Sequence, residues 1–458
     1  MYNVEKNIST LSEGSELTVD ISRWDNEGRG IADLPGGKIC FVEGAVPGET
    51  VNIRISLNKK NYAEAVLTSV ITPSPHRVTR TSGCEGARLD HVDYDGQTEF
   101  KFNKVRDCLI RIGGVPEDVA DRVMRPVITA DRLYNYRNHM QYRIKGGRIC
   151  EVKRNSNDLV PVTVSDIEYE IFGKVRSALE QILDNAPTEL FSGVVLRASE
   201  RTHELLVELV SRDARTHELV IRDTSVYVEA CKVASKITEA ASGYRLRGIL
   251  LRISPDKVSS RTRSGKRVVL TGDDFYEEKM CGRTFRVKAG AFFQVNTEQA
   301  EKLYRAASEG IGETDVIYDV YCGTGTIGLS CTGDKNTLIG IESVREAVDS
   351  ARINASISGV DNARFICRPA EKVDPAKDRL PHPDVVIVDP PRKGMDPVFV
   401  RRLLELKPPR ITYISCDPAT MARDLKMLTR DYDILSVTPA DLFCRTEHVE
   451  TVVQLTKK

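Results

Sequence analysis

Two side chains in the last fifth of the sequence are of the types that nucleophilic catalysis needs, and the first is a thiol. Cys416 follows a strand-like run, Ile411–Ser415, and precedes Asp417-Pro418, which is typical of the first turn of a helix. The positive end of a helix dipole favours a thiolate, and the Asp417 carboxylate opposes it. Cys416 is therefore a candidate nucleophile with no assigned pKa. A buried strand-end thiol without a chemical role is the alternative interpretation.

The second candidate is a carboxylate. Glu450 lies in an alternating segment, His448–Leu455, that is typical of a strand. His448 and Glu450 fall on one face, and a buried carboxylate is costly unless it is used or paired. Glu450 is therefore a candidate general base, whereas a structural role is the preferred interpretation of His448.

A glycine-rich loop after another strand predicts a cofactor site. The strand Val316–Val320 leads into Tyr321-Cys322-Gly323-Thr324-Gly325-Thr326-Ile327-Gly328, which matches the G-x-G-x-x-G pattern at Gly323 and Gly325. Glu342, nineteen residues after Gly323, is placed to accept hydrogen bonds from ribose hydroxyls. The pattern alone does not separate a nicotinamide cofactor from S-adenosylmethionine. A glycine turn that binds nothing is the third possibility.

Two aspartates favour S-adenosylmethionine. Asp319 ends the first strand, where it suits the cationic amino acid end of that cofactor and would repel a pyrophosphate. The apolar run Val385–Val388 delivers Asp389-Pro390-Pro391-Arg392 to the same sheet edge, which is where open α/β sheets bind ligands. We expect Asp389 to contact the cofactor or the substrate.

The elements that position these residues form three predicted domains. Residues 9–71 contain short strands separated by turn clusters, which indicates a small barrel of the oligonucleotide-binding type. Residues 76–275 are mixed α and β. Residues 280–458 alternate strands and helices, which predicts a doubly wound α/β sheet. The predicted strands are Val316–Val320, Thr337–Ile341, Ala363–Cys367, Asp384–Val388 and Ile411–Ser415, and the predicted helices include Gln97–Ile112, Val344–Ser356 and Pro397–Leu406.

Charge and composition bound the partners. The 458 residues include 66 Lys+Arg and 66 Asp+Glu, and this zero net charge argues against a protein that coats nucleic acid by bulk electrostatics. Residues 76–154 nevertheless carry 16 basic against 11 acidic side chains, and residues 240–300 carry 12 against 6, which suggests a defined anionic partner. The apolar runs are too short to cross a bilayer and no secretory signal is visible, so a cytoplasmic protein without a membrane partner is expected. None of the 11 cysteines forms a C-x-x-C pair, so no metal site is predicted.

Five motifs occur together in order: Gly290–Asn296, Asp319–Gly325, Asp389–Gly394, Ser415–Thr420 and His448–Thr451. Together they resemble the RNA uracil-C5 methyltransferases, which make 5-methyluridine in tRNA and ribosomal RNA. The barrel, with Gly28-x-Gly30 and Val46-Pro47-Gly48-Glu49, resembles the TRAM module of the branch that acts on 23S rRNA. The similarity covers nearly the whole chain and is weakest from about 155 to 275.

The resemblance implies a Rossmann-like S-adenosylmethionine methyltransferase domain, an OB-like TRAM barrel and a mixed α+β central domain that binds RNA. Cys416 would add to carbon 6 of a flipped-out uridine, and Glu450 would remove the proton from carbon 5. The implied partner is RNA, 23S rRNA before tRNA, and the implied state is a monomer. The residues implied to bind S-adenosylmethionine are Gln294, Tyr321, Gly323, Gly325, Glu342 and Asp389.

The sequence departs from the family at one point. Many rRNA-type members hold an iron–sulfur cluster on four cysteines, but the matching positions here fall on Cys84 and Ala87 and near Val78 and Ser165. One thiolate cannot hold such a cluster, so none is expected, and Cys84 is interpreted as a packing or vestigial residue.

Two other classes remain open at this stage. One is a non-enzymatic RNA-binding or ribosome-assembly factor that retains the fold, against which the intact Cys416 and Glu450 count. The other is a nicotinamide-dependent oxidoreductase that uses the glycine loop after Val320.

Overall fold

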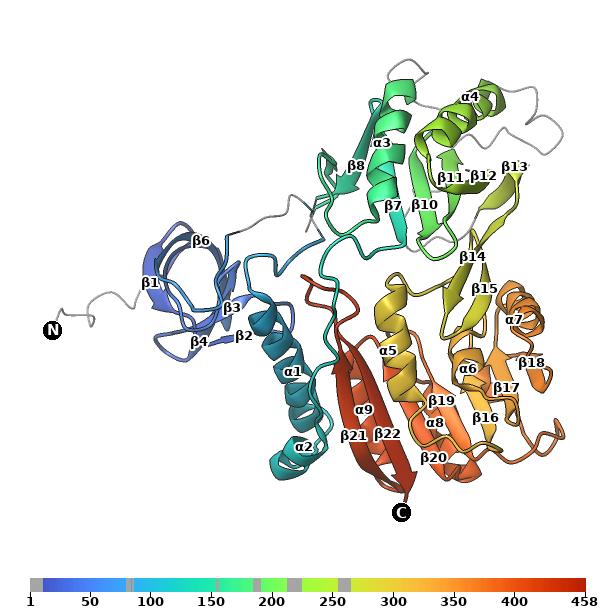
Figure 1. Cartoon of the computed structure of the whole chain (residues 1–458). Coiled ribbons are helices and arrows are strands. Elements are labelled where there is room, and N and C mark those ends of the chain that lie inside the picture. The colour runs from blue at the N-terminus through green and yellow to red at the C-terminus, as the bar shows by residue number, and fades with distance from the viewer. Residues whose placement is uncertain are drawn as a thin grey trace.

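The computed structural model describes residues 11–79, 84, 86–153, 156–183, 191–211, 225–253 and 265–458. In these ranges the chain forms a six-stranded sheet, two seven-stranded sheets and a two-stranded sheet, each followed by or packed with helices (Figure 1). None of the helices in the described ranges has the length and apolar character needed to span a membrane.

The six-stranded sheet rolls into a small barrel with the strand order β1-β5-β6-β4-β3-β2 (Figure 1). Its interior is apolar because alternate residues of each strand face inward, as Val51, Ile53 and Ile55 do in β5. The two strands that the sequence pattern did not predict, β2 and β3, are short and flank a tight turn at residues 25–29. The barrel strands are β1 Glu16–Asp20, β2 Arg23–Trp24, β3 Gly30–Leu34, β4 Lys38–Glu43, β5 Thr50–Asn58 and β6 Tyr62–Thr72.

Two helices follow the barrel, α1 Tyr94–Arg111 and α2 Glu117–Val123. α1 begins earlier than predicted because the Asp93 carboxylate accepts a hydrogen bond from the Gly96 amide at 2.8 Å and caps the helix. Buried residues of both helices, such as Val105 and Ala120, join the core of the C-terminal sheet. These helices lie within residues 76–275 but pack outside the core of the central sheet.

The central sheet has the strand order β13-β12-β11-β10-β7-β8-β9, and its core lies between one face of the sheet and helices α3 and α4. The predicted pairing of the segments at 193–198 and 205–210 is present as an antiparallel pair. The elements are β7 His139–Lys145, β8 Arg148–Val152, β9 Leu159–Pro161, α3 Glu170–Leu183, β10 Gly193–Ser199, β11 Glu204–Ser211, α4 Ser225–Ala240, β12 Arg245–Ile253 and β13 Lys266–Gly272.

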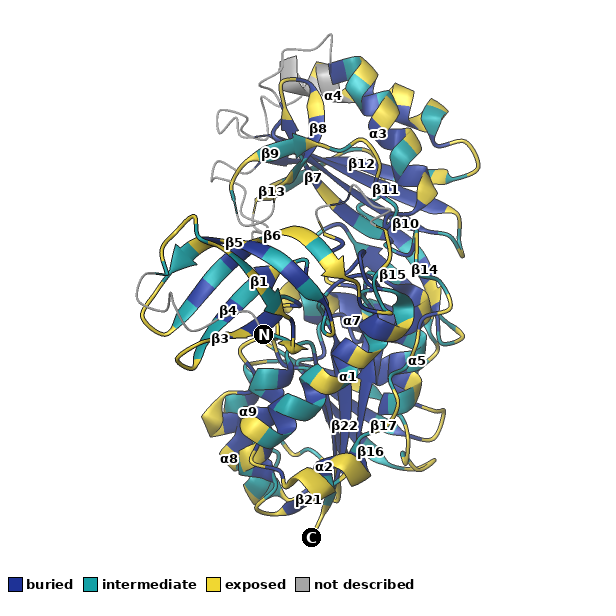
Figure 2. Ribbon diagram, turned by 90° about the vertical axis from the view of Figure 1, so that its left-hand side faces the viewer, coloured by how far each residue is buried: buried dark blue, intermediate teal, exposed yellow. Residues whose placement is uncertain are grey.

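The C-terminal sheet has the strand order β18-β17-β16-β19-β20-β22-β21, preceded by the hairpin β14–β15. In Figure 2 its strands are mostly buried, and exposed residues concentrate on helices and turns. The elements are β14 Phe275–Met280, β15 Arg283–Lys288, α5 Thr297–Ala307, β16 Val316–Val320, α6 Thr326–Cys331, β17 Thr337–Glu342, α7 Arg345–Ile357, β18 Ala363–Cys367, the 3-10 helix η3 Ala370–Lys372, β19 Val385–Val388, α8 Pro397–Leu406, β20 Arg410–Ser415, α9 Pro418–Leu428, β21 Tyr432–Ala440 and β22 Glu450–Lys457.

The direction of β22 positions the site. β16 to β20 are mutually parallel, whereas β22 runs antiparallel to β20, and Ser415 pairs with Thr451. The beginning of β22 therefore lies beside the end of β20, at the edge where the parallel strands deliver their loops.

Candidate active site

The strand register brings Cys416 and Glu450 to the same edge of the C-terminal sheet. Cys416 is the residue after β20 and is half-buried, whereas Glu450 is the first residue of β22 and is only 4% exposed. Each flanks the paired residues Ser415 and Thr451, so the candidate nucleophile and the candidate base meet without any loop rearrangement.

The two carboxyl groups at this edge hold their protons unusually strongly. Burial raises the pKa of Glu450 to about 8, with a contribution from Asp389 that Arg392 opposes. Burial likewise raises the pKa of Asp389 to about 7, and the Asp319 carboxylate contributes. Perturbed acids of this kind are typical of sites that transfer protons near neutral pH.

The Cys416 thiol is protonated in the free protein. Burial and the nearby carboxylates of Glu450 and Asp389 raise its pKa to about 12, against the effect of Arg392. The helix dipole does not compensate, because the Asp417 carboxylate accepts hydrogen bonds from the Ala419 and Thr420 amides at 3.0 Å and caps α9. The thiol must therefore lose its proton after substrate binds.

Cys416 opens into a cavity of about 620 Å³ that several parts of the chain enclose. Four cationic side chains line it, which suits an anionic substrate, and sequence reasoning did not single them out because they come from separate segments. The lining residues are Asn26, Glu27, Gly86, Arg88, Lys104, Cys108, Arg137, Arg392, Cys416, Asp417, Pro418, Ala419, Thr446, Glu447 and His448.

His448 lines the same cavity as a neutral imidazole. Burial lowers its pKa to about 4, the charges of Arg392 and Lys104 act in the same direction, and Glu447 opposes them. Its ring packs edge-on against Phe443 with centroids 5.9 Å apart. A neutral, packed ring is consistent with the structural role expected from the sequence.

The glycine loop leaves β16 through three residues with positive φ. Tyr321 has φ 66°, Gly323 has φ 54° and Gly325 has φ 80°. The Glu342 carboxylate accepts a hydrogen bond from the Gly323 amide at 3.2 Å and another from the Val344 amide at 2.8 Å. The expected ribose acceptor is thus held in place at the end of β17, at the mouth of the loop.

Asp319 does not take the position expected from the sequence. It is 0% exposed, and one of its carboxylate oxygens accepts a hydrogen bond from the Gly328 amide at 2.8 Å. Burial raises its pKa to about 7. The side chain therefore supports the glycine loop from inside the fold and does not face a ligand.

Of the other predicted cofactor residues, Tyr321 is part of this loop and the Asp389 amide donates a hydrogen bond to the Val320 carbonyl at 3.4 Å. Gln294 is buried just before α5, and its backbone carbonyl accepts a hydrogen bond from the Asn138 side chain at 2.9 Å. Asp389 follows β19 directly and is half-buried. Tyr321 packs edge-on against Phe399 of α8 with ring centroids 5.8 Å apart.

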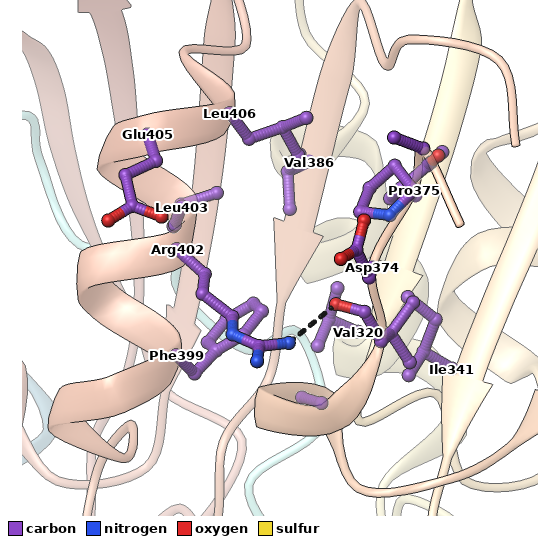
Figure 3. Close-up of a pocket in the computed structure, with 14 residues that line it drawn as sticks. Val320, Ile341, Asp374, Pro375, Val386, Phe399, Arg402, Leu403, Glu405 and Leu406 are labelled. Carbon is purple, nitrogen blue, oxygen red and sulfur yellow. Dashed lines mark hydrogen bonds between the residues drawn. The ribbon is translucent and has the colours of Figure 1, made fainter. Parts of the chain in front are cut away.

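A second cavity of about 360 Å³ lies behind the loop, between the sheet, η3 and α8 (Figure 3). It is largely apolar, and Arg402 in its lining donates a hydrogen bond to the Val373 carbonyl at 3.0 Å. None of the predicted site residues lines it, although its wall includes Phe399, on which Tyr321 packs.

The positions that correspond to a cluster site do not fit an iron–sulfur cluster. The buried Cys84 thiol contacts the Ser165 hydroxyl and the Glu151 carboxylate at 3.9 Å, and Ala87 packs beside it with Ile167. No group of three or more His, Cys, Asp or Glu side chains suited to a metal ion occurs in the described part of the chain.

The loop between β21 and β22 connects the site to the rest of the molecule, and sequence reasoning missed it. Lys101 of α1 forms a fully buried ion pair with Asp441 and also donates to the Phe443 carbonyl at 3.0 Å. The Arg445 amide donates to the Gln97 side chain at 2.8 Å. These contacts hold the segment that leads into Glu450.

Sheet order and glycine loop define this fold as that of the S-adenosylmethionine-dependent methyltransferases. Comparisons with known proteins agree. The model of a family described as tRNA (Uracil-5-)-methyltransferase matches residues 251–458, and that of the TRAM domain matches residues 11–68. Two proteins described as uncharacterized RNA methyltransferases are each 32% identical to this chain. The one from Gloeobacter violaceus aligns over 97% of this chain and 97% of its own length, and the one from Lactococcus lactis over 100% and 99%.

A solved structure extends the comparison to the whole chain. The crystal structure of Pyrococcus abyssi tRNA (uracil-54, C5)-methyltransferase in complex with S-adenosyl-L-homocysteine has a TM-score of 0.75 and 26% identity, over 96% of this chain and 99% of its own. The chain belongs to the RNA uracil-5 methyltransferase family. The resemblance, the fold class and the enzyme class predicted from the sequence are confirmed.

Proposed function

We propose that this enzyme methylates carbon 5 of one uridine in RNA through a covalent bond between Cys416 and the uracil. The observation that carries the proposal is the register of β20 and β22, which places the buried Glu450 carboxyl beside the Cys416 thiol, and this thiol lines a cavity with four cationic side chains. S-adenosylmethionine supplies an electrophilic methyl group.

The residues act in sequence on a flipped-out uracil. The Cys416 thiol proton passes to the Asp389 carboxylate, which is about half ionised at pH 7 given its raised pKa. The thiolate adds to carbon 6, and the electrons of the carbon 5–carbon 6 double bond move toward oxygen 4 as an enolate, which Arg392 stabilises. Carbon 5 would then take the methyl group, and the carbon–sulfur bond that held it would break to leave S-adenosylhomocysteine.

The last step restores the double bond of the uracil ring. The Glu450 carboxylate removes the remaining proton from carbon 5, the double bond re-forms, and the Cys416 thiolate leaves. Asp389 returns its proton to the departing Cys416 thiolate, and Glu450 releases the carbon 5 proton to solvent, so one proton is lost for each methyl group transferred. Because the pKa of Glu450 is about 8, its ionised form is a minority at pH 7.

The residues at the loop after β16 fit the cofactor. Gly323 and Gly325 adopt positive φ and keep the backbone open, and Glu342 is anchored by backbone amides where a ribose binds in related sheets. We assign Tyr321 and Asp389 to the same site because Tyr321 is part of this loop and Asp389 is hydrogen-bonded to Val320 at its start. We assign Gln294 to it because this residue belongs to the Gly290–Asn296 motif that resembles the family.

We propose 23S rRNA as the substrate and a monomer in the cytoplasm as the working form. The barrel adjoining the cavity supports a large structured RNA, and one chain completes the cavity. A tRNA is the second candidate, because the aligned Pyrococcus abyssi enzyme, described as a tRNA methyltransferase, matches 96% of this chain.

The test uses RNA from cells that lack this enzyme. Purified full-length protein and S-adenosylmethionine are added, and 5-methyluridine is mapped in rRNA and tRNA. We expect one modified uridine, no product with Cys416→Ala, and normal product with Cys108→Ala, which removes another thiol of the same cavity. Glu450→Gln is expected to accumulate a protein–RNA adduct that survives denaturing electrophoresis. Product from Cys416→Ala would overturn the mechanism, and a Cys416→Ala gene that rescues every phenotype of a deletion would favour a non-enzymatic role.

A further inference from the structure

The turn between β2 and β3 of the barrel reaches the cavity at Cys416. Asn26 and Glu27, at the tip of this turn, line that cavity together with the nucleophile. Asn26 and Glu27 thus border the same cavity as Cys416, although they lie almost 400 positions away from it in the sequence.

The turn is rigid. One oxygen of the Asp25 carboxylate accepts hydrogen bonds from the Glu27 amide at 2.9 Å and the Arg29 amide at 2.8 Å. The other oxygen forms an ion pair with the Arg29 guanidinium at 2.7 Å. Such side-chain bonds to the backbone fix a turn, so little entropy is lost when the tip contacts a ligand.

The turn is also fixed against the catalytic part of the chain. Gly28 has φ +76°, and a Cβ there would lie 2.9 Å from Leu89 Cδ2 and 3.8 Å from Glu447 Cβ. Arg88 forms ion pairs at 3.5 Å with both Glu27 and Glu447. The distance between the tip and Cys416 is therefore set by packing and charge together.

Asn26 is the residue of the tip with an available polar group. Its side chain is exposed, and within the described residues its carboxamide makes no hydrogen bond, whereas Glu27 pairs with Arg88. A carboxamide offers two donors and an acceptor, the combination that bonds two atoms of a base edge at once. Unstacked RNA bases present such edges to proteins.

We infer that Asn26 reads the base of a nucleotide next to the methylated uridine, and so helps to select the site in RNA. The inference rests on the proposed function, because the flipped uracil occupies the Cys416 end of the cavity and leaves the end at Asn26 to a neighbour. Asn26 is a specificity-determining residue that takes no part in the methyl transfer.

The test uses short transcripts that span the mapped uridine, prepared with each of the four bases at every position within three nucleotides of it. The ratio of kcat/KM between preferred and disfavoured transcripts is measured for the wild type, Asn26→Ala and Asn61→Ala. Asn61 is the matched control, because it is an exposed asparagine on the β5–β6 turn of the same barrel and does not line the cavity. Melting temperatures of the three proteins are compared in parallel.

We expect the wild type and Asn61→Ala to discriminate at one neighbouring position by about 5- to 100-fold, as a bidentate base contact provides, and Asn26→Ala to lose most of that preference. Asn26→Asp, which keeps only acceptors, should shift the preference to a different base. Unchanged discrimination by Asn26→Ala, or no discrimination by the wild type, would overturn the inference and leave the proposed function intact. A wild type that methylates no RNA would overturn both.

Discussion

Replacing Glu450 by glutamine should make the stability of the enzyme less sensitive to pH. The folded carboxyl keeps its proton to about pH 8, whereas the unfolded carboxyl loses it near its ordinary pKa of 4.5. Between these values the unfolded state binds fewer protons, so the free energy of unfolding falls as the pH rises. Glutamine has the same shape and no proton to lose.

The size of the effect follows from the two pKa values. At pH 6 the group lowers the free energy of unfolding by about 2 kcal/mol relative to a permanently neutral side chain, and at pH 8 by about 4 kcal/mol. The free energy of unfolding of Glu450→Gln, relative to that of the wild type, should therefore rise by about 2 kcal/mol between pH 6 and pH 8. Because Glu450 is only 4% exposed, solvent screening does not cancel this difference.

The assay is urea unfolding followed by circular dichroism at several pH values from 6 to 8, with Glu313→Gln as the control for the same chemical change on an exposed side chain. The unfolding free energies of the wild type and of Glu450→Gln, plotted against pH, should diverge steadily from pH 6 to pH 8, whereas those of the wild type and Glu313→Gln should not. Parallel curves would show that Glu450 is already ionised at pH 6, and would refute both the buried neutral acid and the proton inventory built on it.

Three further outcomes are expected. In the wild type, kcat should rise about tenfold between pH 7 and pH 8, where Glu450 loses its proton, and level off above the Glu450 pKa of about 8. Below pH 7 the rise should be steeper, because Asp389, with a pKa of about 7, must also be ionised; a flat profile from pH 6 to 8 would contradict these roles. Gly28→Ala should lose about 1–3 kcal/mol of stability and bind RNA less tightly. Gly14→Ala is the control for backbone strain, because Gly14 has a similar φ but open space around it, and equal losses of stability in the two variants would refute the packing argument. Lys101→Met should cost about 3–5 kcal/mol by leaving Asp441 buried without a counter-charge, and adding Asp441→Leu should recover much of that loss in urea unfolding.

The sequence predicted the elements whose signals are local. β16, β18 and α8 occur with the predicted bounds, because apolar runs between turns mark buried strands and Pro397 marks the first turn of a helix. Cys416 and Glu450 were found because each stands at the end of such a run. Their adjacency follows from the antiparallel insertion of β22, which no local pattern encodes.

What escaped prediction depends on contacts between distant segments. Lys101 and Asp441, separated by 340 positions, form a buried pair that gives no signal in either segment alone. The opposition of Asp417 to the helix dipole was expected, but the raised pKa of Cys416 was not, because it comes mainly from burial and from Glu450 and Asp389, which lie in other segments. Asp319 was misassigned because a strand-end aspartate looks the same whether it points outward or beneath the loop.

Arg88 joins the barrel to the catalytic segment, and this contact limits how freely the barrel could be exchanged for another RNA-binding domain. Arg88 is nearly buried and pairs with Glu27 and Glu43 of the barrel on one side and with Glu447 on the other. Grafting a different RNA-binding module onto this enzyme would remove two of its three counter-charges close to Cys416. A replacement barrel must therefore supply acidic residues at the positions of Glu27 and Glu43, or Arg88 must be replaced in the same step.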